Sequence, residues 1–116
     1  MADGCMKEGT AHHEMMHALG FKHEHVRPDR DTYLTVDHDY LQEYKSSSYH
    51  NFVRLDHWLW QDSDHSFELR SVMNYNGRAY MTTKSGEYWV SNRMRLTSTD
   101  ALQIQWFVII YKTCLR

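Results

Sequence analysis

Three residues near the start of the chain, His13, Glu14 and His17, have the types and the spacing of a metal-assisted hydrolytic site. They form an H-E-x-x-H motif. Side chains four residues apart lie on one face of a helix, with Cβ atoms about 5 to 6 Å apart. Both imidazoles can therefore reach a single Zn²⁺ at roughly 2.0 to 2.1 Å.

A third ligand is needed, because a catalytic zinc site has three protein ligands and one open position. Gly20 can adopt a left-handed conformation that turns the chain sharply, and His23 follows shortly after it. His23 can thus approach the metal from a new direction. The full pattern, H-E-x-x-H-x-x-G-x-x-H, is the metzincin form. It predicts one Zn²⁺ per chain, held by His13, His17 and His23.

The remaining histidines have simpler explanations, although the chain has nine in all. A histidine taken alone is usually a surface residue or a core residue whose hydrogen bonds are satisfied. His12 precedes the ligand pair, but the residue four positions later is Met16, so His12 cannot form the same clamp. No role is assigned to His25, His38, His50, His57 and His65.

A second signal is the segment from Ser71 to Tyr75, which reads SVMNY. A single methionine usually fills space in a core. Metzincins, however, place a tight turn that contains a methionine beneath the zinc, and this segment lies at a suitable distance downstream. Met73 is therefore predicted to support the site from below.

The first motif must lie on a helix, and the flanking residues predict one. Thr10 is a candidate N-cap, the helix is expected to run to about Leu19, and Gly20 ends it. The apolar positions that share one face are Ala11, Met15, Ala18 and Leu19. We expect this face to pack inward, while His13 and His17 point into a cavity on the other side.

The rest of the chain predicts short elements and one further helix. Residues 21–31 indicate a polar connection, Tyr33 to Val36 a strand, and residues 37–64 short helical turns and loops. Thr97 and Asp100 have capping-box spacing at the start of a second helix. The apolar residues of that helix are Ala101, Leu102, Ile104, Val108 and Ile109. The sequence does not indicate where this helix ends, because residues 108–110 are β-branched and disfavour a helix.

Composition excludes several classes of function. A chain of 116 residues has room for one core and one site. Lys and Arg number 13 against 15 Asp and Glu, with no basic stripe, so a nucleic-acid partner is not expected. The longest run of large apolar residues, Trp106 to Tyr111, is far shorter than a membrane span, and no signal peptide is visible.

The stretch from His13 to Asp31, HEMMHALGFKHEHVRPDRD, resembles the extended zinc signature of the astacin family, and SVMNY is similar to the S-x-M-x-Y turn of that family. The matching positions beyond the metal motif are Phe21, Glu24, Arg27, Asp29, Arg30 and Asp31. Asn74 stands where members often carry histidine, at a position that is not a ligand.

The resemblance implies a role for each site residue. The implied zinc ligands are His13, His17 and His23. Glu14 is implied to be the general base, and Tyr75 a fifth ligand that can switch away from the metal and stabilise the oxyanion. Gly20 and Met73 support the site. Glu24 pairs with the mature N-terminus in the family, and that partner is not visible in this sequence.

The resemblance also implies an α+β fold: a metzincin-like lower lobe that contains the zinc helix, the Met-turn and a C-terminal helix. Family domains carry an N-terminal sheet lobe before the zinc helix, whereas about a dozen residues precede His13. We expect residues 1–116 to form a single partial domain, with that lobe largely absent here and encoded upstream. An extracellular location is implied as well. Residues 100–114 look longer than the family pattern by roughly one helical turn, so the docking of this helix is open.

Two cysteines, Cys5 and Cys114, allow two interpretations. A disulfide between them would close almost the whole chain into one loop, and free thiols are the alternative. In the family, the partners of both cysteines lie in the N-terminal lobe. The resemblance therefore implies free thiols or mixed disulfides in this chain.

The sequence thus predicts a zinc-dependent endopeptidase that hydrolyses peptide bonds with a metal-activated water and a glutamate base. The rival hypothesis is a truncated protease-like domain that binds zinc but is catalytically weak or inactive. A purely structural zinc module is disfavoured, because it would prefer four permanent protein ligands.

Overall fold

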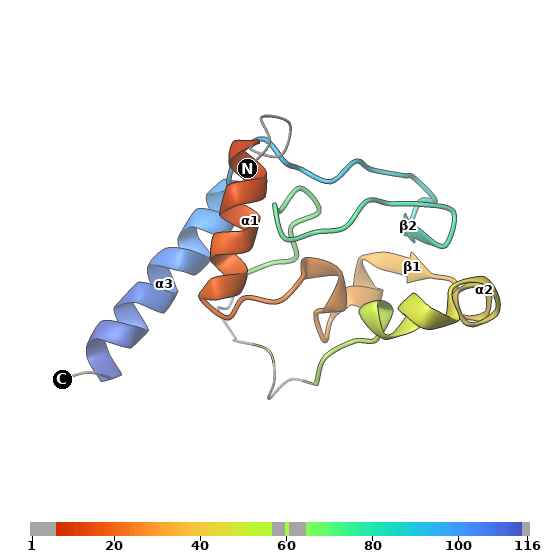
Figure 1. The fold of residues 1–116 in the computed structure, drawn as a ribbon, viewed down its shortest axis with the longest axis horizontal. Helices are drawn as coiled ribbons and strands as arrows, with labels where there is room; N and C mark the ends of the chain where they lie inside the picture. The colour runs from red at the N-terminus through yellow and green to blue at the C-terminus, as the bar shows by residue number, and fades with distance from the viewer. Residues whose placement is uncertain (1–6, 57–59, 61–64, 115–116) are drawn as a thin grey trace.

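The computed structural model describes residues 7–56, 60 and 65–114. Within these ranges the chain has an α+β architecture, as predicted (Figure 1). The α-helices are α1 (Glu8–Ala18), α2 (His38–Tyr44) and α3 (Ser98–Cys114). Short 3₁₀ segments are η1 (Glu24–Val26), η2 (Arg30–Thr32) and η3 (Ser46–Phe52), and the strands are β1 (Leu34–Val36) and β2 (Met81–Thr83).

Helix α1 ends where the sequence predicts but begins earlier. Gly20 has a φ of 94°, in the left-handed region, and the amides of Gly20 and Phe21 donate to the carbonyls of His17 and Met16. This is a Schellman motif. The prediction that Thr10 is the N-cap is wrong, because the helix already begins at Glu8.

The early start of α1 has a tertiary cause. The Gly9 amide donates to the Arg93 carbonyl oxygen at 3.1 Å, and a Cβ at Gly9 would lie 2.2 Å from the Arg93 carbonyl carbon. A glycine lets two backbones approach this closely. The contact with residues 93–94 fixes the first turn, and no local capping pattern could indicate it.

The prediction that Ala11, Met15, Ala18 and Leu19 form the inward face is wrong. Met15 is 63% exposed, and Ala18 and Leu19 are also exposed. Met16 and His13 are the buried side chains of the helix, because the segments that pack against α1 approach it from their side. Met16 joins Phe21, Val72 and Met73 in a hydrophobic cluster.

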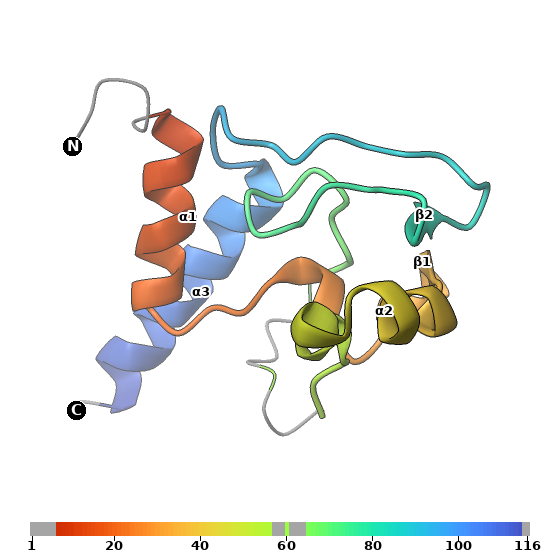
Figure 2. The same ribbon diagram turned by 45° about the vertical axis from the view of Figure 1, so that its right-hand side comes forward.

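Helix α3 begins with the predicted capping box. The Thr97 amide donates to Asp100 Oδ2 and the Asp100 amide donates to Thr97 Oγ1, both at 3.1 Å. The views in Figures 1 and 2 place α3 beside α1. Ile104 and Phe107 pack against the cluster around Met16, so the first half of α3 is docked.

The second half of α3 is exposed. The helix continues through its β-branched residues to Cys114, and every side chain from Val108 onward is exposed. Cys114 forms no disulfide with any described residue, and Cys5 lies outside the described residues, so the two interpretations of the cysteine pair are not tested. Among the residues described, no helix is both long and apolar enough to cross a membrane.

The second part of the molecule is built on a two-stranded antiparallel sheet. The prediction of a strand near Tyr33 to Val36 is confirmed by β1, whose Leu34 is opposite Thr83 of β2. Helix α2 and segment η3 confirm the predicted helical turns as far as Phe52. The buried residues of this part are Leu34, Leu41, Phe52 and Met81, and Tyr75 packs against them. The predicted site residues therefore lie between two hydrophobic clusters.

Candidate metal centre

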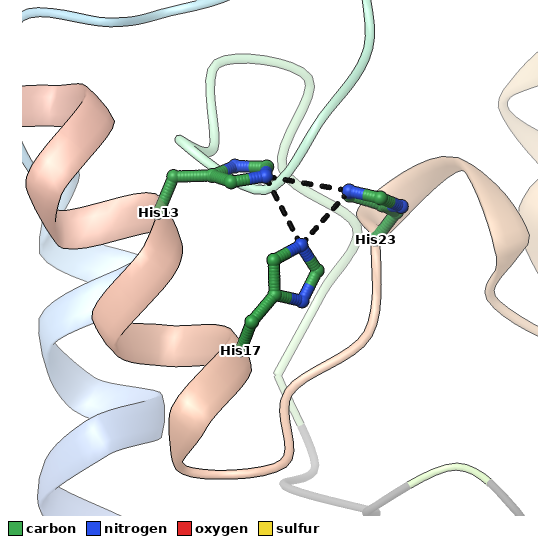
Figure 3. A group of neighbouring side chains, drawn as sticks. All are labelled: His13, His17 and His23. Carbon is green, nitrogen blue, oxygen red and sulfur yellow. Dashed lines mark hydrogen bonds between the residues drawn. The ribbon is translucent and has the colours of Figure 1, made fainter.

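The three predicted ligands converge on one point (Figure 3). His17 Nε2 lies 3.0 Å from both His13 Nε2 and His23 Nε2, and the last two atoms are 3.3 Å apart. A tetrahedral zinc ion with ligand nitrogens at 2.0 to 2.1 Å would hold them about 3.3 to 3.4 Å apart. The three nitrogens thus form one face of a tetrahedron of the right size, to within a few tenths of an ångström.

The hydrogen bonds of the Nδ1 atoms of His13 and His17 also indicate a metal site. His13 Nδ1 lies 2.7 Å from the Val72 carbonyl oxygen, and His17 Nδ1 lies 2.9 Å from the Phe21 carbonyl oxygen. A carbonyl oxygen only accepts, so each Nδ1 carries the proton and each Nε2 presents a lone pair. Lone pairs of this kind cannot hydrogen-bond one another. Their convergence is the arrangement of metal ligands whose outer nitrogens are fixed by hydrogen bonds.

Burial favours the neutral, metal-binding form of the imidazoles of His13 and His23. It lowers the pKa of His13, and it lowers the pKa of His23 to about 3, with smaller contributions from the neighbouring histidines. A metal ligand must be a neutral imidazole. His13 and His23 can therefore bind a metal at neutral pH without first losing a proton.

His23 is placed by the chain that follows α1. Gly20, with its positive φ, follows the end of α1, and three residues later His23 is the N-cap of η1. The amide of Glu24 donates to the Met73 carbonyl oxygen at 2.9 Å, which ties the residue after His23 to the turn. The position of His23 thus depends on a contact between segments that are about fifty residues apart in sequence.

The charged residues of the longer signature build the segment behind His23. Arg27 donates to both carboxylate oxygens of Asp29, at 2.9 and 3.1 Å, and to Glu24 Oε1 at 3.1 Å. Glu24 Oε1 also accepts from the Glu68 amide. Burial raises the pKa of Glu24 to about 7, against the opposing effects of that amide and of Arg27. Among the described residues, the Glu24 carboxylate is thus bound by the Arg27 guanidinium and the Glu68 amide.

Arg30 has a similar structural role. Its side chain is fully buried, and Nη1 donates to the carbonyl oxygens of His25 and Phe52 at 2.9 Å each. Its Nε lies 2.7 Å from Asp31 Oδ1. A guanidinium offers several donors in a fixed plane, so one side chain can satisfy two buried carbonyls at once. These bonds join η1 to η3.

The turn from Ser71 to Tyr75 is anchored by Asp100 at the start of α3. Asp100 is fully buried and accepts from the Ser71 hydroxyl and from the Val72 amide. The Val72 carbonyl in turn accepts from His13. Met73 lies in the cluster with Met16 and Phe21. Asp100 of the capping box is therefore also bonded to the residue whose carbonyl oxygen accepts from His13.

Tyr75 follows the turn and lies against two histidines. Its ring centroid is 4.4 Å from that of His23 and 4.0 Å from that of His25, and the stack with His25 is nearly parallel, at 28°. The indole nitrogen of Trp89 donates to the Tyr75 carbonyl oxygen at 2.6 Å. Tyr75 thus lies beside His23, the predicted third ligand.

Glu14 lies between the ligand residues of α1 in sequence, and its side chain is exposed. The structure thus brings together the predicted ligands and Tyr75, with Glu14 on the ligand helix. Four residues near the site were missed: His25, Trp89, Arg93 and Asp100. The capping box predicted Asp100 as a residue that begins α3, but not its hydrogen bonds to the turn. Nothing in the spacing of the other three indicates that they contact Tyr75 or His13.

The comparisons with known proteins agree with this geometry. Residues 1–104 match the model of the peptidase family Astacin. Zinc metalloproteinase nas-8 of Steinernema carpocapsae is 36% identical over 97 residues, which make up 83% of this chain and 22% of that protein. Seminal metalloprotease 1 of Drosophila melanogaster is 35% identical over 81 residues, or 69% of this chain and 31% of that protein.

A solved structure extends the likeness to the fold. High choriolytic enzyme 1, a hatching enzyme zinc-protease from Oryzias latipes (Medaka fish), is similar with a TM-score of 0.72 and 25% identity. The match covers 96% of this chain and 56% of that one. The chain spans less than a third of the length of the two curated relatives. With a family match over nine tenths of its length and a shared fold, the chain belongs to the astacin family of zinc metalloproteases.

Proposed function

We propose that this chain binds one Zn²⁺ through His13, His17 and His23 and carries the catalytic centre of a zinc-dependent endopeptidase. The observation that supports this most is the convergence of three Nε2 atoms within 3.3 Å of one another, with two rings fixed by carbonyl oxygens. Zinc at such a site lowers the pKa of a water toward neutrality and polarises a carbonyl oxygen.

The residues of the chain then have separate tasks. Glu14 is the general base: its exposed carboxylate accepts a proton from the attacking water and returns it to the departing amine. Tyr75 donates a hydrogen bond to the substrate oxygen as negative charge develops on it. Its position beside His23, with ring centroids 4.4 Å apart, supports this role. Gly20 and Met73 are supporting residues.

The substrates proposed are proteins or peptides, as the family implies. One relative is named a seminal metalloprotease and a similar solved structure is a hatching enzyme, and an extracellular location is proposed for this chain on the same basis. An N-terminal lobe encoded upstream, which would complete the substrate cleft in a single catalytic domain, is also part of the proposal.

The test is the replacement Glu14→Gln, made in a protein in which the proposed N-terminal lobe precedes residues 1–116, because the 116-residue chain alone is expected to cleave poorly. Glutamine keeps the shape of the side chain but cannot accept the proton at neutral pH. The zinc-loaded wild type should cleave a casein-type substrate, and the variant should bind the same amount of zinc while losing nearly all cleavage. Undiminished cleavage by the variant contradicts the assignment of Glu14. Stoichiometric zinc without any cleavage by the wild type would favour the second candidate, a zinc-binding chain with weak or no turnover.

A further inference from the structure

Arg93 lies in the connection between β2 and α3 and reaches the metal centre with its side chain. Its Nη1 lies 2.8 Å from the Val72 carbonyl oxygen and 2.6 Å from His13 Nδ1. The same carbonyl oxygen lies 2.7 Å from His13 Nδ1. One backbone oxygen therefore faces two donors, one on a ligand and one on Arg93.

The protonation of His13 decides which of these contacts are hydrogen bonds. With the proton on Nδ1, the ring donates to Val72 and leaves Nε2 free as a ligand, so Arg93 can donate only to the Val72 carbonyl oxygen. A bond from Arg93 to Nδ1 would require the proton on Nε2, which would remove the ligand atom. In the metal-binding form, His13 Nδ1 and Arg93 Nη1 thus both donate to the Val72 carbonyl oxygen, whose two lone pairs can accept both hydrogen bonds.

The backbone of Arg93 forms a second connection to the same helix. Its carbonyl oxygen accepts from the Gly9 amide at 3.1 Å, about one turn before His13. A Cβ at Gly9 would collide with this backbone, so the approach is close. Arg93 therefore holds α1 through its main chain and the Val72 carbonyl through its side chain.

From this we infer that Arg93 is a positioning residue of the metal centre: by binding the Val72 carbonyl oxygen and the start of α1, it fixes the acceptor that orients His13. The inference rests on the proposed zinc site. Residues that orient a ligand histidine through its outer nitrogen typically change metal affinity 10- to 100-fold when replaced. Arg93 acts one step further out, through the carbonyl, so we expect a loss of about 10-fold.

Two competing roles make different predictions. If Arg93 acted only through its charge, its removal would tighten the binding of a cation, because a positive charge near the site repels it. Arg93 also borders a cavity of about 190 Å³ together with Tyr75 and Arg78. If it only contacted a substrate there, its removal would raise KM and leave zinc affinity unchanged.

The experiment compares Arg93→Met, which keeps the length of the stem, with Arg93→Lys, which restores a donor. Arg95, an exposed residue two positions along, supplies the control Arg95→Met. The zinc dissociation constant of the 116-residue chain is measured by competition with a chromophoric chelator, and the Co²⁺-loaded chain gives an absorption spectrum that reports ligand geometry. Circular dichroism establishes that each variant is folded.

We expect Arg93→Met to weaken zinc binding about 10-fold and to alter the cobalt spectrum, with Arg93→Lys recovering most of both and Arg95→Met matching the wild type. Unchanged or tighter zinc binding by Arg93→Met overturns the inference. If Arg93→Met is not folded, Arg93→Lys decides: its affinity should lie within a few-fold of the wild type, and a full loss of about 10-fold contradicts the donor role. Failure of the wild type itself to bind zinc would refute the proposed function instead.

Discussion

Two segments of the molecule combine regular structure and burial in opposite ways: the turn from Ser71 to Tyr75, and the last part of α3 from Val108 to Cys114. The turn has no regular secondary structure, yet its first four residues are buried. The end of α3 is a regular helix, yet all of its side chains are exposed and four consecutive residues of it are large and apolar. The family match includes the turn and stops at residue 104. Regular hydrogen bonding within an element therefore says little about how firmly that element is positioned.

Contacts between distant segments account for the difference. Asp100, 28 residues or more from its partners in the turn, accepts from the Ser71 hydroxyl and the Val72 amide. A hydrogen bond to a charged group contributes about 1.5 to 3 kcal/mol, and a buried partner left alone costs a similar amount. The apolar residues from Val108 to Tyr111 keep 40 to 57% of their surface exposed, so they contribute less to folding than fully buried residues do.

The largest effect is expected from His23→Ala, which removes the ligand whose neighbour is tied to the turn. Two imidazoles and water cannot replace a three-histidine site, so the zinc should be lost on dialysis. Atomic absorption measures the metal content. His50→Ala, at an exposed position in η3, is the control and should retain its zinc. Full retention by the His23 variant would remove it from the ligand set.

The next effect is expected from Asp100→Ala. This change leaves the Val72 amide and the Ser71 hydroxyl without their buried acceptor and also breaks the capping box, so unfolding should cost about 3 kcal/mol less. Zinc affinity should fall as well, because Val72 orients His13. Urea unfolding measures the first quantity and chelator competition the second. Ser98→Ala, at an exposed position in the same turn of α3, should change both far less. Equal effects of the two variants would contradict the anchoring role of Asp100.

A smaller and more selective effect is expected from Gly20→Ala. Gly20 and Gly86 both have positive φ, at 94° and 84°. Alanine in this conformation costs of order 1 kcal/mol at either site, and a Cβ at Gly86 meets no atom within 4 Å. Both variants should therefore lose about the same stability in urea. Only Gly20→Ala should weaken zinc binding, because Gly20 lies between His17 and His23 in the chain, whereas Gly86 is distant from both in sequence. A loss of zinc affinity in Gly86→Ala would show that general destabilisation explains the effect.

The smallest effect is expected at the exposed end of α3. Ile109 is 57% exposed, so Ile109→Ala should change the free energy of unfolding by no more than about 0.5 kcal/mol. Phe107, which packs against Phe21 with ring centroids 5.8 Å apart, is the matched position, and Phe107→Ala should cost about 2 kcal/mol. Urea unfolding of both variants sharpens the comparison. A large loss in Ile109→Ala would mean that this end of α3 is covered in solution.

The sequence predicted the parts of the molecule that depend on local spacing. His13 and His17 are one helical turn apart, Gly20 is the left-handed residue, and Thr97 and Asp100 cap a helix, all of which can be inferred from neighbours in the chain. The catalytic roles of Glu14 and Tyr75 stay predictions.

The parts that depend on tertiary packing could not be predicted. Met15 and Met16 are neighbours with the same side chain, yet Met15 is exposed and Met16 is buried. Which of the two is buried depends on where the turn and α3 pack against α1. Strand β2 forms because β1 pairs with it. It is only three residues long, too short for its own sequence to indicate a strand. Arg93 lies 80 residues from His13 and carries no motif.

The central claim is that three histidine nitrogens and an open position form a single zinc site. X-ray absorption at the zinc edge, on the 116-residue chain loaded with one equivalent of Zn²⁺, measures the ligands directly. The expected result is four light scatterers, with three imidazole nitrogens at about 2.0 to 2.1 Å and no sulfur. Sulfur at about 2.3 Å, which would place Cys5 or Cys114 on the metal, or fewer than three imidazoles, would contradict this account.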